Sequence, residues 1–118
     1  MKRQIITISD SGVVCIPGEV GMSIAEIADL FGIYYQTAKR HIRSIEKSGV
    51  LDGNYSMNCT VEGQKVYPDY YGLEMIIAVA FRVQSAKAKM FRRYIMRKIV
   101  RHDAAETLIL PLQNPMLN

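Results

Sequence analysis

The stretch that decides the fold is SIAEIADLFGIYYQTAKRHIRSI, residues 23–45. Ser23 and Glu26 have the spacing of a capping box, in which the serine hydroxyl accepts from the third backbone N–H of a helix and the glutamate accepts from the serine N–H. Apolar residues then recur at helical spacing up to Gly32, a residue that readily adopts positive φ. We therefore expect a short helix that begins at Ile24 and ends before Gly32.

A second helix is expected directly after this one. The pattern runs from Tyr34 or Tyr35 to about Lys47, and Ser48-Gly49 is a typical helix end. The residues expected to face inward are Ala38, Ile42 and Ile45. The residues expected to face outward are Lys39, Arg40, Arg43 and Lys47.

Two short helices joined through a glycine match the constraints of a helix-turn-helix. Ala28 is small enough for the helices to cross closely, Gly32 makes the turn, and Ile33 supplies an apolar plug after it. The segment resembles the DNA-reading unit of bacterial repressors, and Tyr35-Gln36-Thr37 is similar to the start of the recognition helix in lactose-repressor-type proteins. The alternative is an αα-hairpin that binds nothing.

The side chains of the second helix have the chemistry that base recognition needs. In the major groove, an amide such as Gln36 pairs with adenine and a guanidinium such as Arg40 pairs with guanine. Tyr34 and Tyr35 offer a ring to a thymine methyl or a hydroxyl to a phosphate. The DNA-binding candidates of this segment are Ser23, Tyr34, Tyr35, Gln36, Thr37, Lys39, Arg40 and Arg43, of which Ser23, Lys39 and Arg43 suit the phosphate backbone.

Strand-like runs flank the helix pair on both sides. The first turn is Ser9-Asp10-Ser11-Gly12, flanked by residues 3–8 and 13–16. The second turn is Glu62-Gly63-Gln64, flanked by residues 56–61 and 65–70. Each set predicts a β-hairpin. The fold class expected is α+β, a winged-helix-like domain with a helix-turn-helix and two short β-hairpins.

Two further helices and a strand are expected in the second half. Residues 73–83 are apolar and long enough for a buried helix. Ser85 can cap a helix from Ala86 to about His102, and a last strand is expected at residues 107–112. The residues that should hold the helix from Ala86 on the core are Met90, Phe91, Tyr94, Ile95 and Ile99.

That last helix is strongly basic. Residues 61–118 carry nine basic and five acidic side chains, and seven of the basic ones lie within residues 86–102, which contain no acid. Lys89, Arg92, Arg93 and Arg97 are therefore candidates for DNA phosphate contacts. The alternatives are a solvated face, RNA contact and an acidic protein partner.

Composition limits the other classes of protein. The 118 residues carry a net charge of +4 and are 49% hydrophobic, as expected for a single domain, residues 1–118. The longest apolar run has seven residues, too few for a membrane span, and a cytoplasmic location is expected. Cys15 and Cys59 are expected to be buried free thiols, although a disulfide is an alternative. Without a metal, cofactor, nucleophile or small-molecule motif, no enzyme activity is expected.

A larger part of the chain resembles one family. The block Tyr71-Gly72-Leu73-Glu74-Met75-Ile76-Ile77 and the continuation Arg82-Val83, together with Ala28-Asp29-Leu30-Phe31-Gly32, resemble the virulence-associated RhuM family over about residues 20–100. This family is assigned to DNA binding and is linked to genomic islands and phage-like elements. The resemblance implies a DNA-binding domain of winged-helix character.

Together these patterns predict a sequence-specific duplex DNA-binding protein that regulates transcription of a mobile-element or accessory locus. A homodimer is expected, because one short helix contacts few base pairs. The candidate pairing surface is the apolar tail, with Leu108, Ile109, Leu110, Leu112, Met116 and Leu117; the alternative is that residues 108–112 are an internal strand. The rival from another class is a protein-interaction module that uses the outward tyrosines and this tail. An RNA-binding domain is a third reading, for which the strand aromatics and the GXXG loop are missing.

Overall fold

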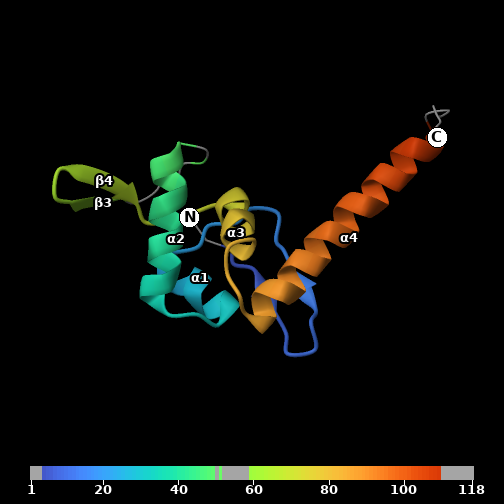
Figure 1. The fold of residues 1–118 in the computed structure, drawn as a ribbon, viewed down its shortest axis with the longest axis horizontal. Coiled ribbons are helices and arrows are strands. Elements are labelled where there is room, and N and C mark those ends of the chain that lie inside the picture. The colour runs from blue at the N-terminus through green and yellow to red at the C-terminus, as the bar shows by residue number, and fades with distance from the viewer. Residues whose placement is uncertain (1–3, 50, 52–58, 110–118) are drawn as a thin grey trace.

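The computed structural model describes residues 4–49, 51 and 59–109 (Figure 1). Within these residues the protein has mixed α+β structure, with four helices and two antiparallel two-stranded hairpins. The elements in order are β1 (Thr7–Ile8), β2 (Val14–Cys15), α1 (Ile24–Phe31), α2 (Tyr35–Ser48), β3 (Cys59–Glu62), β4 (Lys65–Pro68), α3 (Leu73–Ala80) and α4 (Ala86–Ile109).

The first helix has the ends that the sequence predicts. The Glu26 N–H donates to Ser23 Oγ at 3.2 Å, and the Ser23 N–H donates to Glu26 Oε1 at 2.8 Å, so the capping box is complete. Gly32 has φ 64° in the left-handed region, where the Ile33 N–H reaches the Ala28 carbonyl at 3.0 Å. Both ends are therefore set by local hydrogen bonds.

The second helix also confirms its prediction. It spans Tyr35–Ser48, and Gly49 ends it with φ 78°. Ala38, Ile42 and Ile45 are buried, as their spacing indicates. This inward stripe seats α2 on the core and leaves the other sides of the helix to neighbours or solvent.

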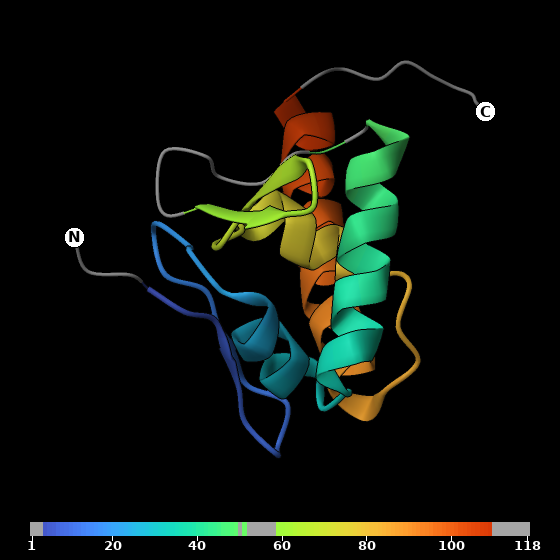
Figure 2. The same ribbon diagram turned by 90° about the vertical axis from the view of Figure 1, so that its left-hand side faces the viewer.

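The core is built around α3, which contacts both α2 and α4 (Figures 1 and 2). The predicted helix over residues 73–83 is confirmed, although it ends at Ala80 with Phe81 as its cap. Met75, Ile76 and Val79 are almost fully buried. Phe31 of α1 meets Phe91 of α4 edge to face, with ring centroids 5.6 Å apart. Helices from both halves of the chain thus share one apolar cluster.

Both predicted hairpins form. In the first, Thr7 pairs with Cys15 and Ile8 with Val14. In the second, Glu62 pairs with Lys65, so the turn is Gly63-Gln64 and Glu62 is the last residue of β3 rather than part of the turn. The residues before Cys59 in the predicted strand lie outside the described residues. The β3–β4 hairpin extends from the body beside α2 (Figures 1 and 2).

The last helix differs from its prediction. α4 continues to Ile109, beyond the expected end near His102, and residues 107–109 are helical rather than a strand; residues 110–112 lie outside the described residues. Residues 102–109 contain no glycine or proline, and their alanines and glutamate are good helix formers. The second part of α4 projects beyond the body of the protein (Figure 1). Ile99, expected on the core, is 48% exposed for this reason.

The cysteine prediction is half correct. Neither Cys15 nor Cys59 forms a disulfide, as expected, but both are exposed rather than buried. In the first hairpin, neighbouring side chains point to opposite faces, and Ile8 and Val14 take the buried face. Cys15 is therefore left on the outer face.

Candidate nucleic-acid interface

Two predicted base-reading residues lie on a free side of α2. Gln36 and Arg40 are both exposed and are one helical turn apart, so they share a face. Thr37, next along the helix, is half-buried. Tyr34, which precedes the helix, is 85% exposed and Tyr35 is 46% exposed. An amide, a guanidinium and two phenol rings are therefore presented at the first two turns of α2.

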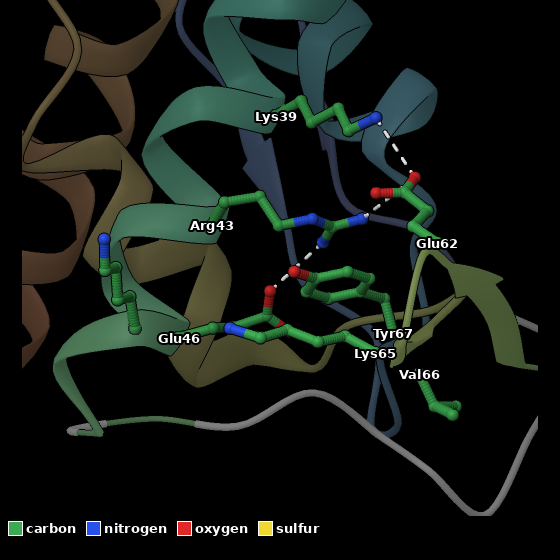
Figure 3. Close-up of a pocket in the computed structure, with 8 residues that line it drawn as sticks. Lys39, Arg43, Glu46, Glu62, Lys65, Val66 and Tyr67 are labelled. Atoms are coloured by element: carbon green, nitrogen blue, oxygen red, sulfur yellow. Dashed lines mark hydrogen bonds and ion pairs between the residues drawn. The ribbon is translucent and has the colours of Figure 1, made fainter.

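The side of α2 that faces the hairpin is different, because two of its cations, Lys39 and Arg43, are already paired. Lys39 Nζ lies 3.1 Å from Glu62 Oε2, and Arg43 Nη2 lies 3.7 Å from the same oxygen (Figure 3). The Arg43 guanidinium carbon also lies 3.7 Å from the centre of the Tyr67 ring. Arg43 was expected to face solvent, but its side chain is only 20% exposed because β3 and β4 cover it. One carboxylate of the hairpin thus bridges two cations of the helix.

Behind this bridge lies a buried polar network. Arg43 Nη1 donates to Tyr71 Oη at 2.8 Å and to Glu46 Oε1 at 3.1 Å. Burial by itself lowers the pKa of Arg43, but Tyr71 and Glu46 outweigh it and hold that pKa above its ordinary value. Burial and the Glu46 carboxylate raise the pKa of Tyr71 despite the nearby guanidinium. Arg43 therefore stays charged and anchors α2 to the segment before α3.

The helix and the hairpin enclose a groove of about 540 Å³, which we call the α2–hairpin groove (Figure 3). Its lining residues are Lys39, Arg43, Glu46, Lys47, Glu62, Lys65, Val66 and Tyr67. Four of these eight are cationic and two are acidic. The groove can accept an anion if the Glu62 side chain moves away from Lys39 and Arg43.

A smaller hollow of about 330 Å³ lies at the start of α1, and Ser23, Tyr35, Thr60 and Tyr70 are among its lining residues. Ser23 was expected to contact a phosphate. Its oxygen accepts the Glu26 N–H within the capping box, and its side chain is half-buried. The hydroxyl proton is still able to donate toward this hollow.

The cations predicted on α4 are divided by the fold. Lys89, Arg93 and Arg97 are exposed. Arg92 instead donates to the carbonyl oxygens of Ala80 and Val83 at 2.7 and 2.8 Å, where it satisfies the C-terminal end of α3. As a whole, α4 lies on the other side of the molecule from the β3–β4 hairpin, which flanks α2 (Figure 1).

Sequence reasoning missed the hairpin's part in the site. Glu62, Lys65 and Tyr67 were treated only as strand or turn residues, yet all three line the α2–hairpin groove. The sequence did contain a signal for this part of the site. The basic helix is followed by a hairpin that has an acid, Glu62, and a base, Lys65, beside its turn. Tyr71 gave no such signal, because the tertiary fold brings it to Arg43. Glu46 is three residues from Arg43 on α2, so helical spacing could have predicted that ion pair.

Comparisons with known proteins identify no relative: neither a family model, nor a curated protein, nor a solved structure matches the chain. The described residues contain no group of three metal-ligating side chains. In the same residues, no helix combines the length and the apolar character that crossing a membrane requires. The geometry of the site therefore carries the functional argument.

Proposed function

We propose that the protein binds duplex DNA as a winged-helix domain, with α1 and α2 as its helix-turn-helix and the β3–β4 hairpin as its wing. The observation that carries this proposal is the exposed pair Gln36 and Arg40 on the free side of α2, beside a projecting hairpin. The resemblance to the RhuM family supports the same reading.

The chemistry of recognition follows from these two side chains. An α-helix fits the major groove, where a glutamine amide forms two hydrogen bonds with adenine and an arginine forms two with guanine. Each good bidentate pair is worth about 1–3 kcal/mol of discrimination against a wrong base. Because Gln36 and Arg40 are one turn apart, they would read neighbouring positions of one half-site.

The remaining cations of the site supply affinity rather than sequence information. Lys39, Lys47 and Lys65 line the groove between helix and hairpin, where a phosphate backbone would pass. Tyr34 and Tyr35 are available for a thymine methyl or a phosphate oxygen. On α4, Lys89, Arg93 and Arg97 form a second basic surface, which the proposal assigns to sequence-independent phosphate contacts.

The biological role we propose is regulation of transcription at a mobile-element or accessory locus, by a homodimer that reads two half-sites. The proposed locus rests on the family resemblance, and the proposed homodimer rests on the small number of base pairs that a single helix contacts. The apolar residues 110–117 of the suggested pairing segment lie outside the described residues.

One observation favours the alternative of a protein-interaction module. A tyrosine that is 85% exposed, as Tyr34 is, buries a large ring surface when a partner protein covers it. In that case Tyr34→Ala would abolish partner binding, while DNA binding would be absent altogether.

Selection from random duplex DNA tests the proposed function directly. We expect one enriched motif, and an affinity that falls with salt at a slope of about 0.9 for each phosphate neutralised. We expect the basic surface to neutralise about four to seven phosphates. Failure to bind any duplex at low salt would contradict the proposal.

A further inference from the structure

The Glu62 carboxylate lies where an external anion would lie in the α2–hairpin groove. Its Oε2 atom is 3.1 Å from Lys39 Nζ and 3.7 Å from Arg43 Nη2, and the carboxylate is itself 42% exposed at the groove (Figure 3). One oxygen between an ammonium and a guanidinium is the arrangement that a phosphate oxygen also adopts in protein sites.

We propose that the α2–hairpin groove binds a phosphodiester of the DNA backbone and that Glu62 occupies the place of this phosphate in the free protein. The inference rests on the proposed function. It adds a competing anion within the protein, which DNA must displace before Lys39 becomes available.

The two cations differ in how firmly the fold holds them. Arg43 keeps three other partners, namely Glu46, Tyr71 and the face of the Tyr67 ring. Within the described part of the chain, the polar partner of Lys39 is Glu62 alone. When Glu62 moves away, Arg43 therefore stays in place as a fixed charge at the floor of the groove, and Lys39 is released toward a ligand.

The rest of the lining favours an extended anion over a small one. Lys47 on α2 and Lys65 on β4 also line the groove, so cations stand on both of its walls. Lys65 pairs across the hairpin with Glu62 in the strand register. A backbone that enters here would therefore contact the helix and the hairpin together.

The ion pairs of Glu62 are weak enough for a DNA phosphate to compete with the carboxylate for Lys39. Ion pairs between partly exposed side chains contribute little, and their removal changes a binding constant about two- to fivefold. Such a pair is weak enough for DNA to break, but it lowers affinity for every sequence, because phosphates are the same at every base pair.

The test compares Glu62→Gln with Asp10→Asn. Asp10 is a matched control, because it is also an exposed carboxylate paired with a lysine, Lys87 at 3.2 Å, but in the β1–β2 turn next to α4. Both variants remove one negative charge; Glu62→Gln removes the ion pairs with Lys39 and Arg43, and Asp10→Asn removes the one with Lys87. Affinity is measured by titration of fluorescent duplex DNA, with selected and random sequences, at several salt concentrations.

We expect Glu62→Gln to raise affinity about two- to fivefold on all duplexes relative to the wild type. The slope of log affinity against log salt concentration should also become steeper by up to about 0.9. In the wild type, the Glu62 carboxylate that DNA displaces takes up a cation from solution, and this uptake is absent in the Glu62→Gln variant. A Glu62→Gln variant with the affinity and slope of the wild type would overturn the inference and leave DNA binding intact, whatever Asp10→Asn does beside α4. Absence of binding in the wild type and both variants would overturn the proposed function as well.

A double-mutant cycle with Lys39→Ala gives a second, independent readout. Lys39→Ala should cost less in the wild type, where Lys39 must first leave Glu62, than in the Glu62→Gln background, where it is free. We expect decreases in affinity of about twofold and about fivefold respectively. The same decrease in both backgrounds would show that Glu62 does not compete for this lysine.

Discussion

α2 and α4 are both basic helices, but the fold covers them differently. α2 is enclosed along one side by the core and along another by the hairpin, so Arg43 is largely covered and Arg40 is exposed. α4 has such support only in its first half, where Phe91 is fully buried; at Ile99 and Val100 the side chains are about half exposed or more. A similar content of cations therefore gives one helix with an organised site and another with a long, uncovered surface.

The largest expected effect separates the two halves of α4. Phe91→Ala removes a buried ring that meets Phe31, and should lower the free energy of unfolding by about 3–5 kcal/mol. Ile99→Ala, at an exposed position, should change it by about 0.5 kcal/mol or less. Urea denaturation followed by circular dichroism measures both. A large decrease for Ile99→Ala would show that the second half of α4 is covered in solution, as in a dimer.

The next effect separates two sides of α2. Gln36→Ala and Arg40→Ala should each weaken binding to the selected DNA site by about 1–3 kcal/mol and relax base preference. Lys39→Ala should weaken all sequences about equally, because phosphates carry no sequence information. Titration of the selected site and of single-base variants distinguishes these outcomes. A uniform decrease for all three variants would mean that α2 contacts only the backbone.

The smallest effect per substituted residue is expected for the exposed cations of α4. Reversal of Arg93 and Arg97 to glutamate should lower affinity for all sequences, by up to about tenfold near 0.1 M salt for each phosphate that the helix no longer binds. The salt slope should flatten by about 1 for each such phosphate, and base preference should not change. Titrations of duplex DNA at several salt concentrations measure both quantities. Unchanged affinity and slope would place α4 away from the DNA and assign it to solvent or an acidic partner.

These comparisons show which parts of the site the sequence could predict. Gln36 and Arg40 were expected outward because Ala38 and Ile42 define the inward stripe, and that expectation is confirmed. The same periodicity placed Arg43 outward, and this was wrong. The helical period of apolar residues identifies which face of a helix packs on the core and which face is opposite to it. It does not show whether another element covers the two sides that lie between these faces.

Arg92 shows the same limit on α4. Its charge and spacing made it a candidate for DNA contact, whereas its guanidinium donates to the Ala80 carbonyl at the end of α3 and to the Val83 carbonyl in the segment that follows. The open carbonyls of a helix end attract any nearby donor. Only the packing of α3 against α4 decides which arginine reaches them.

The sequence by itself determined the local elements. The capping box of Ser23 and Glu26, the left-handed Gly32 and Gly49, and the two hairpins all depend on hydrogen bonds within a few residues, which local sequence encodes. Tertiary structure decided the long-range partners of the cations, whereas the Arg43–Glu46 pair is local to α2. Glu62 is 23 residues from Lys39, and Tyr71 is 28 residues from Arg43. Contacts over such separations form only when the folded chain brings the hairpin and the segment before α3 beside α2, so no local pattern could show that Glu62 and Tyr71 are the partners of these cations.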